Sequence, residues 1–427
     1  MKRLLWIDIS KGLAILFVAY FHFFSTYFQH GVLPPPDWSN VAASALTLLR
    51  LAWFKISGLG FHAVGVFIIL SGWTLMQSTV RRAEKGGIAW GAWYWARFVR
   101  LYPMYWVAHL VYLVSPFVAR LEPVNDRIIL SGWTLMQATM RRVESGPVAW
   151  GGWYRARFLR LYPMYWVAHL VYLVSPFVAR LEPVDDRIIL SLLGLRFIDI
   201  QMNFMYLNAA WWYFAMLIQF YLIFPLLFWM ARRLGPWWFL IIACAAGFFA
   251  RYILLVVWPQ NGLWVLGGFA ICRLPEFALG MSLAMWHRQS SARVEWFLLR
   301  GPGFVVGLIL YPAALQLYHG LYPYIFCDFA TGTCCMLEIV GIAGIISLSS
   351  APAKLFGLVG VYSYGLYLIH QPYVIWLGLR IREVPIWMFL LICIPTLAVL
   401  SAWGMLLEKG TNTLVNKLVS LRKPAHA

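Results

Sequence analysis

The chain has 427 residues, of which 62% are hydrophobic and only 12% are charged. Soluble globular proteins carry about 25% charged residues, so this composition excludes an ordinary water-soluble enzyme and a disordered chain. The long continuous apolar runs also argue against a transmembrane barrel, whose strands alternate. The 34 Lys and Arg against 16 Asp and Glu fit the positive cytoplasmic loops of a helical membrane protein better than nucleic-acid binding.

Eleven segments are apolar enough to be candidate spans, each needing about 20 mainly apolar residues. They lie at 12–29, 58–78, 101–119, 161–179, 208–230, 236–258, 262–286, 302–319, 325–348, 355–378 and 386–407. Asp8 and Lys11 interrupt the first apolar run, so we expect a retained helix and not a cleaved signal peptide. The mixed polarity of 38–54 indicates an interfacial segment.

A tandem repeat interrupts this series. Residues 71–130 recur as 131–190 without a gap, with 50 of 60 positions identical. A solenoid needs at least three units, so this is a duplication of one segment. Within it, residues 128–140 form a shortened twelfth segment that rises only about 20 Å.

The predicted fold is therefore all-α: a polytopic transmembrane bundle of about ten core spans plus a duplicated helix pair. Basic loops place both termini in the cytoplasm, with the chain crossing the cell membrane many times. This arrangement requires 128–140 to cross or deeply enter the membrane. We expect residues 1–407 to form the membrane domain and 408–427 a basic cytoplasmic tail.

The first predicted helix carries ionisable side chains whose spacing puts two of them on one face. Lys11 and His22 are eleven residues apart, which places them on one helix face about 16 Å apart along the axis. Asp8 lies one turn before Lys11, which is expected at the cytoplasmic boundary. A histidine at mid-membrane depth is a functional candidate, and a purely structural hydrogen bond to a neighbouring helix explains it equally well.

Paired arginines follow in each copy of the repeat. Arg97 and Arg100, copied as Arg157 and Arg160, are spaced to share a helix face at the cytoplasmic boundary. Two guanidiniums there can clamp phosphates, although ordinary positive-inside anchoring also accounts for them.

Two later segments also carry polar side chains inside predicted spans. Arg273 and Glu276 can pair at i, i+3, as a structural ion pair or as part of a site. Tyr367 and His370 precede Pro372, where a kink can open a cavity. We predict no partner for Arg251, Glu338 or the duplicated His109 and His169. The sequence contains no metal-binding motif, no phosphate loop and no serine-hydrolase elbow, so no metal site is expected.

Six motifs in order resemble those of the acyltransferase-3 family, integral membrane enzymes that acylate envelope glycans and other acceptors. They are Lys11 with His22, the run ending Ser71-Gly72, Arg97–Arg100 before Tyr-Pro, Gln219–Pro225, Arg273–Gly280 and Tyr362–Pro372. The match departs from the family at Leu217-Ile218, where many members carry an acidic residue, and at Lys11, where many carry Arg.

The resemblance implies transfer of an acyl group, usually acetyl, from cytoplasmic acyl-CoA to a hydroxyl of an extracytoplasmic glycan or lipid-linked sugar. It implies that His22 is catalytic, as a base or as an acyl-carrying nucleophile. The donor and acceptor would be held by Lys11, Ser71, His370 and the paired arginines, with support from Asp8, Arg273, Glu276 and Tyr367. Membrane lipid is the expected surrounding.

Two alternatives stay open. Some relatives are assigned to polysaccharide export, so an exporter or flippase-like transporter is one, although the repeat here is parallel in sequence and encodes only one hairpin-like unit, whereas transporters commonly show inverted repeats. The other is an inactive relative disrupted by the duplication. Of the two arginine copies, the sequence favours the first, because the helix before it has its full length.

Overall fold

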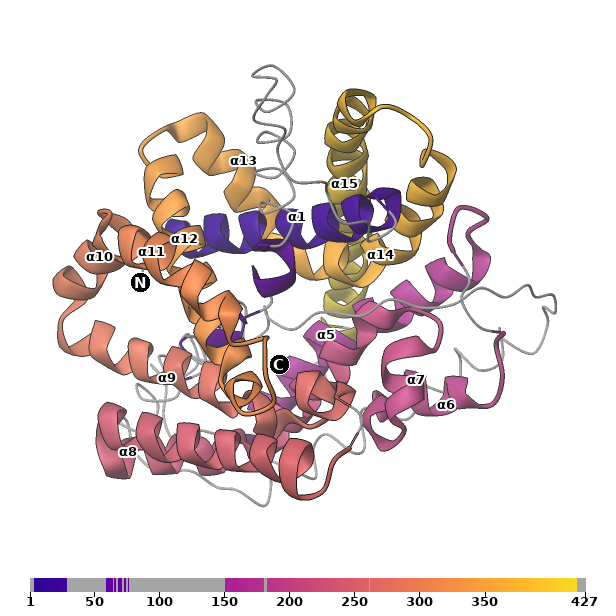
Figure 1. The fold of residues 1–427 in the computed structure, drawn as a ribbon. Coiled ribbons are helices and arrows are strands. Elements are labelled where there is room, and N and C mark those ends of the chain that lie inside the picture. Colours follow the sequence, from indigo (N-terminus) through magenta and orange to yellow (C-terminus); the bar gives the residue numbers. More distant parts are fainter. Residues whose placement is uncertain are drawn as a thin grey trace, which may run out of the picture.

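The computed structural model describes residues 4–28, twelve positions between 59 and 76, and residues 150–179, 183–260 and 262–420. All regular secondary structure in these residues is helical (Figure 1), which confirms the all-α class. The longer helices are α1 (Leu5–Phe28), α5 (Trp150–Val174), α8 (Trp212–Tyr252), α9 (Leu274–Gln289), α10 (Ser291–Leu299), α11 (Pro302–Gln316), α12 (Cys327–Ile346), α13 (Ser350–Val361), α14 (Ser363–Arg380) and α15 (Ile386–Ser420).

Short helices connect them. These are α6 (Arg187–Leu192), η2 (Arg196–Ile198), α7 (Ile200–Met205), η3 (Ala209–Trp211), η4 (Ile253–Val257), η5 (Trp264–Gly268), η6 (Ala270–Arg273) and η7 (Pro323–Ile325). The predicted segments 38–54, 101–119 and 128–140 lie outside the described residues.

Helix α1 lies inside the bundle, in contact with α12, α13, α14 and α15. The most apolar 18-residue stretch of α1 is 83% buried within the protein. Close approach to α13 depends on glycine, since a Cβ on Gly360 would collide with the carbonyl of Asp8. A helix so enclosed exposes little of its surface to lipid, so its polar side chains face other helices.

Helix α14 runs in the same direction as α1. Asp8 lies beside Gly360, just before α14, and Gly378 near the end of α14 packs on Thr26. The predicted span 355–378 is therefore corrected: the chain breaks at Tyr362 (φ −106°, ψ 21°) into α13 and α14, and both helices pack on α1.

Helix α8 is a hairpin of two arms joined at Gly235, whose φ of 74° suits glycine. Phe220 of the first arm stacks on Phe277, and Gly247 of the second arm packs on Pro275. Both arms thus reach the same part of α9, which a straight 41-residue helix, about 60 Å long, could not do. The predicted spans 208–230 and 236–258 correspond to these two arms.

Four helical stretches are long and apolar enough to cross a membrane among the described residues: Leu5–Phe28, Ala209–Val257, Cys327–Ile346 and Ile386–Lys417. Helices α10 and α11 meet the criterion together, with a bend of 53° between them. The chain is therefore a membrane protein of several apolar helices, and the predicted ten core spans stay a prediction.

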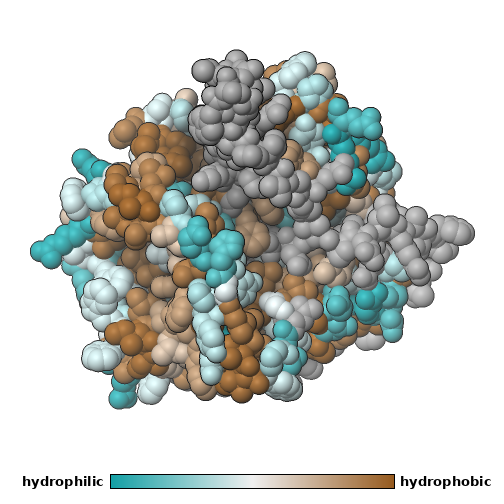
Figure 2. Space-filling model, in the orientation of Figure 1, coloured by the Kyte–Doolittle hydropathy of each residue, from teal (hydrophilic) through white to brown (hydrophobic). Residues whose placement is uncertain are grey.

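The surface agrees with a lipid setting. Large apolar side chains stand exposed, including Ile309 at 68%, Ile394 at 72% and Leu348 at 87%. Figure 2 shows apolar side chains over much of the visible face, interspersed with hydrophilic ones. Such extensive apolar exposure is unfavourable in water and favourable in a bilayer.

Helix α5, from the second copy of the repeat, packs on α14 and α15. Helix α15 continues to Ser420, so the predicted domain boundary at residue 407 lies inside it. Just past that boundary, the carboxylate of buried Glu408 accepts a hydrogen bond from the backbone of Gly365 at 2.8 Å. The first part of the predicted tail is thus packed on the bundle.

The contact between α1 and α13 gives a stability prediction. Gly360→Ala should destabilise the protein by about 1–3 kcal/mol, because the new methyl overpacks a backbone contact. Gly410→Ala is the matched control, since a Cβ on Gly410 meets nothing within 4 Å. It should be neutral or stabilise α15 by up to about 1 kcal/mol. Thermal unfolding in detergent measures both; equal melting temperatures would contradict the close α1–α13 contact.

Candidate active site

The two polar residues predicted to share a face of α1 are both buried. Lys11 is 0% exposed and His22 is 2% exposed. Helix α13 covers this end of α1, so Lys11 is enclosed by protein; its position at the cytoplasmic boundary stays a prediction. Asp8, one turn earlier, is also buried, at 2% exposure. Below, the Lys11 end means the end of the bundle where α1 begins, and the His22 end means the opposite one.

His22 lies beside His370 of α14, 348 positions later in the chain. The ring centroids are 5.7 Å apart and the planes are inclined by 31°. His370 is fully buried, and its Nδ1 lies 2.7 Å from the carbonyl of Tyr367. Carbonyl oxygens only accept, so Nδ1 carries a hydrogen. The structure thus brings two of the predicted site residues together in the protein interior.

Hydrogen bonds hold the His370 turn of α14 against the segment before α8. The hydroxyl of Tyr367 donates to the carbonyl of Ala210, and the Ala210 amide donates to Gln371. Trp211 Nε1 and Asn208 Nδ2 both donate to the carbonyl of Leu368, at 2.9 and 3.0 Å. These bonds hold the turn of α14 that carries His370 against the segment before α8.

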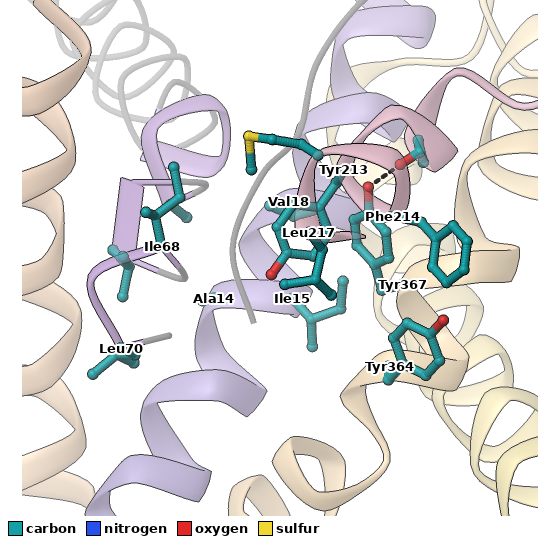
Figure 3. Close-up of a cluster of buried hydrophobic side chains, with 14 of the residues drawn as sticks. Ala14, Ile15, Val18, Ile68, Leu70, Tyr213, Phe214, Leu217, Tyr364 and Tyr367 are labelled. Atoms are coloured by element: carbon teal, nitrogen blue, oxygen red, sulfur yellow. Dashed lines mark hydrogen bonds between the residues drawn. The ribbon is translucent and has the colours of Figure 1, made fainter. Parts of the chain in front are cut away.

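The packing between α1 and α14 is apolar around this pair. Figure 3 shows Tyr367 beside Tyr213 and Leu217 of α8, close to Ile15 and Val18 of α1. All five side chains are buried. The imidazoles therefore lie in a low-dielectric setting that strengthens electrostatic interactions.

A buried charge network lies toward the His22 end of the bundle. Arg273 pairs with Glu276 at 2.9 Å, as their spacing predicts. Asp328 at the start of α12 accepts a hydrogen bond from Arg251 and forms an ion pair with Arg273, each at 2.7 Å. The network thus contains two guanidiniums and two carboxylates. The sequence alone did not identify a partner for Arg251, and the structure shows that this partner is Asp328.

Two further side chains join this network and were not predicted. Tyr318 donates to Asp328 at 3.1 Å, and its hydroxyl lies 3.5 Å from His62 Nδ1. Phe61, next to His62, packs on Phe21 of α1, which locates the network near the His22 end. A lone acidic residue in an apolar segment is the signal that would have identified Asp328.

Gln219 of the mid-chain aromatic motif has a structural position. Its side chain donates to the carbonyl of Gly268 and accepts from the amide of Ala270, both at 3.1 Å. It thereby joins α8 to the turn just before Arg273.

The paired arginines are described in part. Ser71, Arg97 and Arg100 lie outside the described residues. Arg157 and Arg160 lie on α5, and their side chains are likewise outside the description. The backbone is placed by Leu161, whose carbonyl accepts from Tyr364 of α14 at 2.8 Å.

The family comparison decides the class of protein. The model of a family described as an acyltransferase domain matches residues 4–127 and 128–402. The chain belongs to the acyltransferase-3 family. The two matched segments divide three residues before the junction of the repeat copies. Searches of curated proteins and of solved structures found no match.

Membership of this family makes the chain a membrane acyltransferase in general terms. Among the described residues, no group of three or more His, Cys, Asp and Glu side chains is arranged to hold a metal ion. The candidate catalytic groups that the structure brings together are the two imidazoles.

The charge network gives a second stability prediction. Asp328→Asn should destabilise the protein by about 3–5 kcal/mol, because two buried guanidiniums lose a shared carboxylate. Asp185→Asn is the control, since its bridge to Arg187 is partly exposed and is worth about 0–1 kcal/mol. Melting temperatures in detergent compare the two, and a loss for Asp328→Asn no larger than for Asp185→Asn would show that the network is not structural.

Proposed function

We propose that this protein transfers an acyl group, most simply acetyl, from cytoplasmic acyl-CoA to a hydroxyl of an extracytoplasmic glycan or lipid-linked sugar. The observation that carries the proposal is the buried pair His22–His370, on the same α1 face as Lys11 and about 16 Å from it along the axis. Lys11 and His22 are thus separated along one enclosed helix, α1, and His370 of α14 lies beside His22.

The Lys11 end is the proposed donor side. The phosphates of coenzyme A are anionic and require cations, which Lys11 and one pair of the repeated arginines would provide. The long pantetheine arm would extend along α1 and bring its thioester toward His22. This places the charged part of the donor at the membrane boundary and its reacting carbon in the interior.

The proposed chemistry is general-base catalysis. An alcohol is a weak nucleophile, so His22 takes its proton as the oxygen bonds to the thioester carbon. The carbon–sulfur bond then breaks, and the same proton passes to the departing thiolate. His370 supports the step as a positioning residue, with its ring held through Nδ1 by the Tyr367 carbonyl. No redox partner or external proton is needed.

The acceptor approaches from the His22 end. A sugar hydroxyl would reach His22 from the side where α1 ends, opposite the donor. The enclosure of α1 by other helices then keeps bulk water away from the thioester, which favours transfer over hydrolysis.

Activity of histidine variants tests the proposal. His22→Ala should lower acyl transfer about 100- to 10,000-fold, because the base is lost. His370→Ala should cause a smaller loss. His319→Ala is the matched control, since His319 is exposed, whereas both imidazoles of the pair are buried. The assay follows thiol release from acetyl-CoA with an envelope glycan fraction as acceptor.

The outcomes separate the alternatives. Wild-type transfer by His22→Ala, with the protein inserted and folded, would refute the assignment. Glycan movement across vesicles without any acyl donor would favour an exporter instead.

A further inference from the structure

Helix α5 comes from one of two nearly identical segments. Residues 150–174 differ from their first-copy equivalents 90–114 at only three positions, Gly152, Arg155 and Leu159 in place of Ala92, Trp95 and Val99. Arg155 is exposed. The described buried positions of α5 carry the same residues in both copies: Tyr154, Phe158, Leu161, Pro163, Met164, Tyr165, Ala168, His169 and Tyr172. Side-chain packing on α14 and α15 therefore does not by itself select a copy.

The residues that follow α5 do distinguish the two copies of the repeat. His169 Nε2 lies 2.9 Å from Ser191 Oγ, and Tyr165 donates to the Ser191 carbonyl at 2.8 Å. Arg196 donates to Ser191 Oγ at 2.6 Å and to the carbonyls of Met202 and Tyr206 at 2.8 and 2.7 Å. Ser191 thus links the end of α5 to the buried Arg196, which in turn holds the backbone of the loop before α8.

The first copy does not continue in this way. Sixty residues before Ser191 and Arg196 stand Ser131 and Met136. A methionine donates no hydrogen bond, so the arginine that organises the loop is missing after the first copy. Two more bonds, from Trp166 to the Leu192 carbonyl and from Tyr162 to the Leu193 carbonyl, join α5 to residues directly beyond the repeat.

Helix α5 also has the right direction for donor binding. The carbonyl of Leu161 accepts a hydrogen bond from Tyr364, and the amide of Ala179, further along the chain, donates to the carbonyl of Pro372 at 3.1 Å. Residue numbers thus increase in the same direction along both segments, so α5 runs parallel to α14 and hence to α1. Arg157 and Arg160 precede Leu161 by four residues and one, about 6 and 1.5 Å nearer the start of α5. Their helix positions therefore lie toward the Lys11 end.

We infer that the second copy supplies the working arginine pair, Arg157 and Arg160, for the phosphates of the donor. The first-copy pair, Arg97 and Arg100, does not take part. This assignment rests on the proposed function for the identity of the donor. It reverses the preference that the sequence gives to the first copy, because that preference considered only the helix upstream and not the loop downstream.

A cross-linking experiment tests the placement without any substrate. Thr411 Oγ1 of α15 lies 3.8 Å from Met164 Sδ of α5. In full-length protein in membranes, Met164→Cys with Thr411→Cys should be joined by a short thiol-reactive bifunctional reagent. The matched pair Met104→Cys with Thr411→Cys should not be. Peptide mass mapping distinguishes these links from any made by the native cysteines. A 104–411 link, alone or at equal yield, would overturn the placement.

Binding of coenzyme A tests the role. Arg157→Ala with Arg160→Ala should weaken binding at least about tenfold and raise KM for the donor more than it lowers kcat. The first-copy double variant, Arg97→Ala with Arg100→Ala, should stay within about twofold of the wild type. Arg157→Lys with Arg160→Lys should bind better than the alanine variant and less well than the wild type, because lysine keeps the charge without the two-pronged guanidinium geometry.

The two possible failures are distinguishable. A loss confined to the first-copy variant, or equal losses in both, would overturn the copy assignment. A wild-type protein that binds no coenzyme A would instead refute the proposed donor, and the cross-linking result would still locate the second copy.

Discussion

The burial of polar side chains in α1 is the constraint on which the structure depends. A lysine and a histidine inside a membrane protein are costly unless other protein groups, in place of lipid, surround them. Helices α12, α13, α14 and α15 meet this requirement by covering α1. The close contact at Gly360 lets α13 lie over Asp8 and Lys11, and α14 brings His370 to His22. The same enclosure keeps the side chains of Lys11, His22 and His370 almost entirely out of contact with solvent.

The charge network joins helices that surround α1. Arg251 belongs to the second arm of α8, Arg273 to the turn before α9, and Asp328 to α12. A single carboxylate joins two guanidiniums, so three elements distant in sequence are fixed at one point. Such a network is stable only as a whole, because removing one partner leaves a buried charge uncompensated.

The sequence predicted what depends on local spacing. The shared face of Lys11 and His22, the Arg273–Glu276 pair and the all-α class follow from helix geometry and hydropathy. It did not predict His22 beside His370, or Arg251 beside Asp328, because these contacts join residues far apart in the chain. The break at Tyr362 was missed because apolar residues lie on both sides of it and make up enough length for one span. The interaction of Arg196 with the second copy was also missed, since its value appears only when Ser191 and Tyr206 are placed in space.

We propose that the donor binds at the Lys11 end of α1 and the acceptor at the His22 end, so that the acyl group crosses from the cytoplasmic side to the other side of the membrane. Inside-out vesicles test it directly: labelled acetyl-CoA is added to the outer, cytoplasmic face, and the label on a lumenal glycan acceptor is counted after removal of surface label. The account predicts protected label in wild-type vesicles and none with His22→Ala. Label that stays on the donor face, or that persists unchanged in His22→Ala, would contradict it.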